Sequence, residues 1–199
     1  PAYRMPGGQN KKIKNAGLNH PGGVMAYFYL DQIPEDSSEV SLSFYEKNGE
    51  LIRSFSSQAK EKADKLKLKK GSNLFVWNMQ YPKAKDFEGM VLWWSSLSGP
   101  EAVPGSYTME LASRGDTLRR EFTILKDPRT ESTREDIQAQ FDFLSEINQK
   151  VSEAHQAILD IRNIKAKLEH FTSRWKGEED KKALIAKAES IDSVLTTVE

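Results

Sequence analysis

Two carboxylates, Asp86 and Glu88, flank Phe87 on a proline-bounded stretch of the chain. Glycosidases use such a pair to protonate the leaving group and to attack the sugar or activate water. Their two carboxyl groups lie on opposite sides of the sugar, about 5 to 9 Å apart, usually in a groove walled by aromatic residues. Because two acids one residue apart on a loop are more often solvated, we expect no catalytic residue here. A hydrolase is kept as the least favoured alternative.

Residue types that bind metals or attack carbonyl carbons are sparse. The chain has no cysteine, which excludes a disulfide, a thiolate nucleophile and a cysteine zinc site. His155 and His170 lie about four turns apart on one expected helix, and His20 lies far away in sequence, so they cannot share a metal. No serine has a nucleophile-elbow context, and no glycine-rich phosphate loop follows a strand. We therefore expect no metal and no cofactor.

The adjacent tryptophans Trp93 and Trp94 are the sharper candidates for binding. Neighbouring residues on a strand point to opposite faces, so one indole can join the core while the other stays outside. A flat outer ring can stack on a glycan or on another protein, with Tyr27, Tyr29 and Tyr81 as candidate companions. The interpretation that we favour is that the C-terminal helices cover the outer ring, because large exposed aromatic patches are uncommon on soluble domains.

Charge patterns argue against nucleic acids and membranes as partners. The 29 basic and 29 acidic residues cancel, whereas both partners attract a clear positive excess. No apolar run approaches the roughly 20 residues that cross a bilayer, so we expect no membrane insertion. Residues 56–70 hold six lysines in their last eleven positions but no interleaved aromatic residue to stack on bases. We interpret this segment as a solvated loop or a lysine-protected edge strand.

Short segments of alternating apolar residues predict the elements that must position these residues. Phe75, Trp77 and Tyr107 lie on the apolar faces of two such segments and form the predicted structural core. Seven short strands with turn residues between them fit an immunoglobulin-like or fibronectin III-like β-sandwich. The predicted strands cover residues 24–30, 39–46, 51–55, 75–79, 90–94, 107–112 and 118–125.

The turns and one strand allow finer predictions. Asn48 and Gly49 tolerate a positive φ, which favours a type I′ turn between the second and third strands. Residues 24–30 are apolar on both faces, which predicts a central or covered strand. Residues 113–116 are expected to close the last hairpin. They contain Arg114-Gly115-Asp116, the tripeptide that integrins recognise, but the turn itself explains the glycine.

Beyond residues 126–129 the pattern becomes helical. Ser132 with Glu135 offers a capping box, and apolar residues then recur at steps of three and four from Ile137 to Phe171. This pattern predicts a helix of about 40 residues that carries a coiled-coil seam. Gly177 suits the left-handed position after that helix. A second helix, over about residues 178–199, should fold back as an antiparallel hairpin. We expect it to bury Leu184, Ala188, Ile191, Leu195 and Val198.

These elements give a two-part α+β chain. Residues 1–23 read as a linker from an upstream domain, residues 24–126 as the sandwich, and residues 127–199 as a helical hairpin truncated at its C-terminal end. The second helix is too short to cover all of the first. The part of the seam over residues 137–151 must therefore meet the sandwich, a partner, or a second copy in a homo-oligomer.

Several motifs together resemble one family. They are NHPGGVMAYFYL, GSNLFVWNMQYPKAK with GMVLWW, GPEAVPGSYTMEL, KDPR, DIQAQFDF and IRNIKAKLE. In this order they resemble the C-terminal region of sortilin-like, BNR-repeat proteins of Bacteroidetes that are often labelled glycosyl hydrolases. The core is also similar to the immunoglobulin-like domain of flagellar hook-capping proteins, which shares the asparagine-aromatic-tryptophan strand and the proline-glycine-x-tyrosine strand.

The resemblance implies a secreted or periplasmic parent protein with a β-propeller upstream, where any hydrolytic site would lie. No catalytic residue of the family can be placed on this chain. The family usually has an aspartate after the core tryptophan, and this chain has Asn78. We expect a non-catalytic accessory region for packing, spacing or protein interaction, with a carbohydrate-binding module as the alternative.

Overall fold

The computed structural model describes residues 21–33 and 38–198, so most of the predicted linker and His20 lie outside it. The chain forms two compact units. The sheet unit comprises the residues up to Tyr81 and residues 101–138. The helical unit comprises residues 82–100 and the residues from Ala139 onward. Residues 82–100, which were expected to belong to the sandwich, group with the helices instead.

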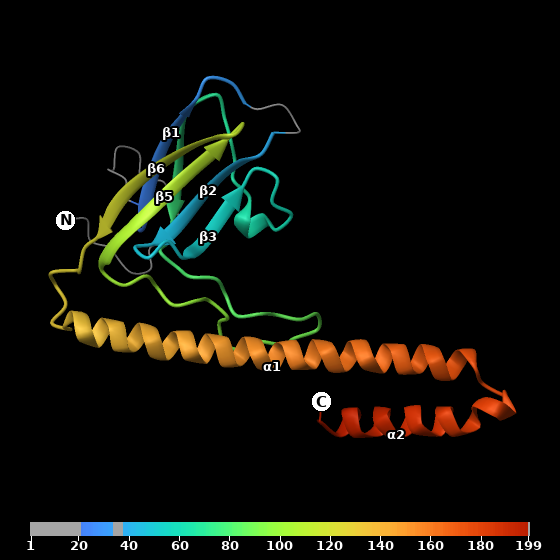
Figure 1. The fold of residues 1–199 in the computed structure, drawn as a ribbon. Helices are drawn as coiled ribbons and strands as arrows, with labels where there is room; N and C mark the ends of the chain where they lie inside the picture. The colour runs from blue at the N-terminus through green and yellow to red at the C-terminus, as the bar shows by residue number, and fades with distance from the viewer. Residues whose placement is uncertain (1–20, 34–37, 199) are drawn as a thin grey trace, which may run out of the picture. The chain divides into compact units, whose positions relative to one another are not determined.

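Two open antiparallel sheets make up the sheet unit (Figure 1). In the first sheet, β1 (Val24–Leu30) pairs with β4 (Gly71–Trp77). The second sheet has the order β3 (Leu51–Ser56), β2 (Val40–Glu46), β5 (Gly105–Ser113) and β6 (Asp116–Ile124). These pairings confirm six of the seven predicted strands, with small shifts of their ends.

Aromatic rings join the two sheets across one core. The ring of Phe44 on β2 stacks on that of Trp77 on β4, with centroids 4.5 Å apart. Trp77 is fully buried, and its indole N–H donates to the carbonyl of Gln80 at 3.2 Å. Tyr107 is also buried and donates its hydroxyl to the carbonyl of Val103 at 2.7 Å. Phe75 packs against this cluster from its rim. Each polar atom carried into the core by an aromatic ring therefore has a partner.

Gly23 and Asn73 hold the backbone around β4 in place. Gly23 has φ +126°, and a Cβ there would lie 2.2 Å from the carbonyl oxygen of Trp77. Only glycine allows this approach of the two strands. The buried Asn73 side chain accepts from the Lys69 N–H at 2.9 Å. Its amide donates to the carbonyls of Lys69 and Gly71 at 2.8 and 2.9 Å. One side chain thus organises the turn that leads into β4.

Two predictions about the sheet unit are wrong in detail. Within the described part of the chain β1 pairs with β4 alone and is therefore not a central strand there, and the exposed Tyr27 and Tyr29 show that its outer face is not covered. Asn48 does not adopt a positive φ. Gly49, at φ +88°, donates to the Glu46 carbonyl at 2.9 Å, so a type I turn followed by a left-handed glycine replaces the predicted type I′ turn.

The β5–β6 hairpin turns at the expected place. Arg114 and Gly115 both have positive φ, at +54° and +88°, and Ser113 pairs with Asp116. This is the type I′ geometry that a two-residue hairpin requires.

The lysine-rich segment 56–70 is a loop with one 3₁₀ turn over Lys62–Asp64, as the loop interpretation predicted. Leu66 is buried and donates its N–H to the carbonyl of Ser56 at 2.8 Å.

The first helix, α1 (Arg134–Arg174), has 41 residues, close to the predicted length. Its cap lies one residue later than predicted. Asp136 accepts from the N–H of Thr133 at 2.8 Å, and Thr133 Oγ1 accepts from the N–H of Asp136 at 3.1 Å. This reciprocal pair replaces the predicted pairing of Ser132 with Glu135. After the helix, Gly177 adopts the left-handed conformation at φ +95°.

A 3₁₀ turn (Glu179–Lys181) leads into α2 (Lys182–Val198), which runs back along the C-terminal part of α1 (Figure 1). The packing is looser than a coiled-coil seam requires. Of the five residues expected to be buried, only Ala188 is buried and Leu195 is half-buried, whereas Leu184, Ile191 and Val198 are exposed. The prediction of a closed seam is therefore wrong for these three residues.

Candidate functional site

The loop of residues 82–100 contacts α1 through the residues near its start and end, which are called its base here. Its two ends are joined by a hydrogen bond from the N–H of Ala84 to the carbonyl of Leu97 at 2.8 Å. Ala84 is buried, and the N–H of Lys85 donates to Ser152 Oγ on α1 at 3.0 Å. A small hollow of about 170 Å³ between the loop and α1 is lined by the seam residues Leu144, Ile147 and Val151 with loop residues that include Ala84 and Leu97. The loop therefore lies beside Leu144, Ile147 and Val151, a part of the apolar seam of α1 that α2 is too short to reach.

Farther along the loop, Phe87 makes a second attachment to α1. Its ring meets that of His155 edge-on, with centroids 5.0 Å apart, and the Arg162 guanidinium lies 4.9 Å from the Phe87 centroid. Arg162 also donates to the carbonyl of Glu88 at 3.0 Å. Because the same loop is held by backbone, aromatic and cation–π contacts, its base is a defined support for the residues that follow.

Those residues form an exposed apolar tip, defined here as residues 90–94. Trp93 is 87% exposed and Trp94 is 98% exposed, and Val91 and Leu92 are exposed beside them. The predicted strand over these residues is wrong, because in the described part of the chain no strand pairs with them. The expectation that one indole joins a core and the other is covered by the helices is wrong as well.

An exposed tip of this composition is unfavourable in water. Each tryptophan side chain buries 150 to 250 Å² when covered, which at about 25 cal/mol per Å² corresponds to roughly 4 to 6 kcal/mol per ring. Contiguous apolar patches on soluble proteins mark places where another molecule binds. The tip, held on a fixed base, is the strongest candidate binding surface among the described residues.

The other three candidate contact residues lie in the sheet unit. Tyr27 and Tyr29 are exposed on the outer face of β1. Tyr81 is half-buried and donates its hydroxyl to the Glu46 carboxylate at 2.6 Å. Burial and this carboxylate raise the pKa of Tyr81 far above its usual value. Its hydroxyl therefore has a structural partner, whereas the rings of Tyr27 and Tyr29 are open to solvent.

The two carboxylates singled out from the sequence lie in water. Asp86 forms an ion pair with Lys83, and this hydrogen bond lowers the pKa of Asp86. A general acid needs a raised pKa, so the shift has the wrong sign for that role. Asp86 and Glu88 are exposed, and neither lines the small hollow described above.

The two described histidines do not converge. His155 donates one hydrogen bond from Nδ1 to the Lys85 carbonyl and contacts Phe87, and His170 is exposed farther along α1. Within residues 21–33 and 38–198, no group of histidine, aspartate and glutamate side chains has a geometry that could hold a metal ion.

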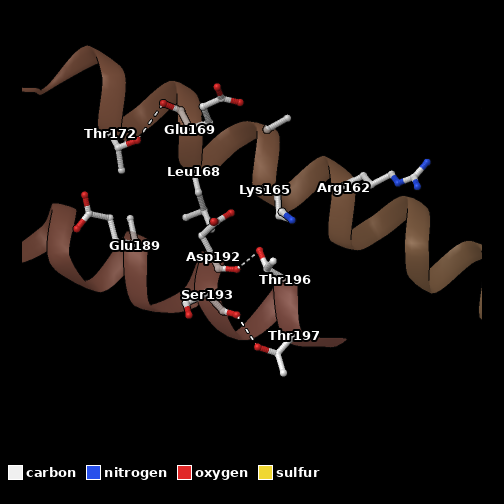
Figure 2. Close-up of a pocket in the computed structure, with 12 residues that line it drawn as sticks. Arg162, Lys165, Leu168, Glu169, Thr172, Glu189, Asp192, Ser193, Thr196 and Thr197 are labelled. Atoms are coloured by element: carbon white, nitrogen blue, oxygen red, sulfur yellow. Dashed lines mark hydrogen bonds between the residues drawn. The ribbon is translucent and has the colours of Figure 1, made fainter. Parts of the chain in front are cut away.

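An open groove of about 900 Å³ lies between α1 and α2 (Figure 2). Its walls combine charges and hydroxyls. Several hydroxyls are already used within their own helix: Thr172 donates to the Glu169 carbonyl at 3.0 Å and Thr196 to the Asp192 carbonyl at 2.8 Å. Such back-bonding directs these hydroxyls at their own helices and not into the groove. We interpret the groove as a consequence of loose helix packing.

No protein-family model, curated protein or solved structure matches this chain. Among the described residues, no helix is both long enough and apolar enough to cross a bilayer.

Sequence reasoning found the tryptophans of the tip but missed Val91 and Leu92. A signal was present: residues 90–94 are apolar without interruption, bounded by Gly89 and two serines, whereas a half-buried strand alternates.

Proposed function

We propose that this chain is a non-catalytic accessory and protein-interaction region of a secreted or periplasmic BNR β-propeller protein. The single observation that carries the proposal is the exposed tip at residues 90–94 on its fixed base. The upstream propeller is the partner that we assign to the tip, and the family resemblance supports both that partner and the compartment. Rigid aromatic anchors are the residues that dominate the energy of protein interfaces.

The finer architecture belongs to the same proposal. We assign the two sheets to an immunoglobulin-like or fibronectin III-like sandwich, supported by the buried Trp77 between them and by the hairpin connections. We assign α1 and α2 to an antiparallel coiled-coil hairpin, supported by the three-and-four spacing of apolar residues along α1. Neither part contributes a reacting group. Their role is to present surfaces.

The test compares one variant in two proteins. Replacing Trp93 and Trp94 together by alanine should leave the unfolding temperature of the 199-residue chain unchanged, because both rings are exposed. The same variant should lower the unfolding temperature of the parent protein by several degrees, since the rings there contact the propeller. Phe143→Ala, at another exposed aromatic residue, is the matched control and should be silent in both. If the tryptophan variant changed the unfolding temperature equally in the 199-residue chain and in the parent protein, the contact between the tip and the propeller would be refuted.

The residues encoded upstream of Pro1 provide an independent test. We expect a signal peptide and repeated propeller blades there. A different domain in that position would remove the propeller from the proposal, whatever the tip binds.

A carbohydrate-binding module is the second candidate, favoured by the exposure of both indole rings of the tip. Indole rings stack on sugar faces, and stacking changes their fluorescence. Titration with a broad panel of polysaccharides should then shift the emission of the chain but not that of the W93A/W94A variant. An unchanged spectrum across the panel would count against this candidate.

A hydrolase is the least favoured candidate, because Asp86 is exposed with a lowered pKa. The chain should release no product from a panel of aryl glycosides. Turnover that disappears in both the D86N and the E88Q variants would revive the candidate.

A further inference from the structure

A tight turn connects the base of the loop to its apolar tip. The N–H of Met90 donates to the carbonyl of Phe87 at 3.4 Å, and Gly89 has φ +81°. Glu88, the other central residue of this turn, does not have a positive φ. A positive φ at the third residue alone is the pattern of a type II turn. The direction in which the tip leaves the base therefore depends on the orientation of the peptide between Glu88 and Gly89.

Arg162 on α1 contacts this turn at two successive residues. Its guanidinium carbon lies 4.9 Å from the centroid of the half-buried Phe87 ring, and its Nη1 donates to the Glu88 carbonyl at 3.0 Å. Figure 2 shows that the Arg162 side chain extends away from α2. The hydrogen bond of His155 lies earlier in the loop, at the Lys85 carbonyl. Arg162 thus contacts the loop closer to the tip than His155 does.

We propose that Arg162 positions the tip by selecting the orientation of the Glu88–Gly89 peptide in which the Glu88 carbonyl faces the guanidinium. Turning this peptide over would convert the type II turn into a type I turn, in which the third residue has φ near about −90°. Glycine accepts both values of φ. The carbonyl of the reversed peptide points away from Arg162, so its hydrogen bond from a charged donor is lost. Arg162 therefore stabilises one of two turns that the sequence allows.

The consequence for binding rests on the proposed function. Trp93 and Trp94 are 87% and 98% exposed, so packing of their own rings does not hold them in one direction. Their direction is inherited from the turn before them. A surface that is already held in its bound orientation loses less conformational entropy when a partner binds. Arg162 is thereby a positioning residue that strengthens the contact of the tip with the propeller without being part of that contact.

NMR spectroscopy of the 199-residue chain tests the turn itself. In a type II turn the Glu88 Hα lies beside the Gly89 N–H, whereas in a type I turn the N–H groups of these two residues lie beside each other. Arg162→Met should weaken the nuclear Overhauser signal of the first pair and produce that of the second. Loss of a hydrogen bond from a charged donor shifts such an equilibrium about tenfold or more.

Lys167→Met is the matched control, because it removes a positive charge from another exposed position on α1. It should change neither signal, and circular dichroism checks that both variants remain helical. Unchanged signals in Arg162→Met, or the same change in Lys167→Met, would overturn the proposal.

The parent protein tests the consequence for binding. Arg162→Met should lower its unfolding temperature by roughly 2 °C more than that of the 199-residue chain, as expected for a contact about tenfold weaker. This difference should vanish when Trp93 and Trp94 are already alanine, since no ring remains to be positioned. Gly89→Ala, which disfavours the positive φ although no atom lies within 4 Å of the added Cβ, should reproduce the effect of Arg162→Met.

The two proposals can fail separately. If W93A/W94A lowers the unfolding temperature of the parent protein but Arg162→Met and Gly89→Ala add no loss there, the positioning role is overturned. If W93A/W94A has equal effects in the parent protein and the 199-residue chain, the proposed contact with the propeller fails. The NMR signals of the turn then decide alone whether Arg162 positions the tip.

Discussion

The sheet unit and the helical unit differ in how each treats its large apolar side chains. In the sheet unit, Trp77 and Phe44 stack in a core from which solvent is excluded. In the helical unit, Trp94 is almost fully exposed and Ile191 is half exposed. A core of the first kind holds the fold together, and surfaces of the second kind are free to bind. The predictions below test this contrast, from the largest expected effect to the smallest.

The two tryptophans give the sharpest contrast. Trp77→Ala removes the ring that joins the two sheets and should lower the free energy of unfolding by about 3 to 5 kcal/mol. Trp94→Ala should change it by less than about 0.5 kcal/mol, because the ring contacts water in the isolated chain. Urea unfolding followed by circular dichroism measures both. Similar losses for the two variants would abolish the distinction between the units.

Glycine positions test how tightly the sheet unit is packed. Gly23→Ala should destabilise the chain by about 2 kcal/mol or more, because its Cβ would collide with the Trp77 carbonyl and its φ is +126°. Gly49→Ala serves as control: its φ is +88°, but no atom lies within 4 Å of the added Cβ. The control should cost about 1 kcal/mol, from backbone conformation alone. Equal losses would mean that the close approach at Gly23 is easily relieved.

Asn73 tests a buried polar contact of the same unit. Asn73→Ala leaves one N–H and two carbonyls without their side-chain partner and should cost about 1 to 3 kcal/mol. Asn78→Ala removes two exposed hydrogen bonds with Gln80, one to its side chain and one from its backbone N–H, and should cost less than about 0.5 kcal/mol because water can replace both. Thermal unfolding of the two variants side by side provides the measurement. A silent Asn73→Ala would show that water replaces the lost contacts.

The smallest effect concerns pH at the start of α1. Hydrogen bonds from Thr133 lower the pKa of Asp136 below its usual value of 3.8. The carboxylate therefore contributes stability above that usual value, and the contribution is lost as pH falls through the lower pKa of the folded state. The first turn of α1 should fray in acid, as followed by amide hydrogen exchange. In Asp136→Asn this part of the acid dependence should be absent, and its persistence would assign the effect to other groups.

Alternation of apolar residues was enough to predict most of the six strands, whereas β1 was predicted from a run that is apolar on both faces. The same kind of run over residues 90–94 is not a strand, because an uninterrupted apolar run has no period that separates a strand from an exposed loop. The helix cap was displaced by one residue because Ser132 with Glu135 and Thr133 with Asp136 both match the capping pattern.

The candidate site was only partly predictable. Sequence reasoning selected Trp93 and Trp94 because large aromatic residues dominate binding surfaces, but it could not determine whether anything covers them. Periodicity similarly identified α2 as amphipathic, yet exposure of Leu184 and Ile191 depends on how closely α1 approaches. The spacing of apolar residues in the sequence specifies which side of a helix or strand is apolar. Only the structure shows which residues, if any, cover that side.

The support of the tip on α1 has a consequence for how this chain can be divided. Residues 82–100 lie between two strands in the sequence, yet Lys85 and Phe87 are held by residues of α1 that follow some 65 or more positions later. A fragment that ends before α1 would contain the strands and residues 82–100, but it would lack the helix that residues 82–100 contact. A gene fragment encoding the helices alone would lack the segment that lines part of their seam. Expression of either part alone should therefore remove the contacts of Lys85 and Phe87 with α1.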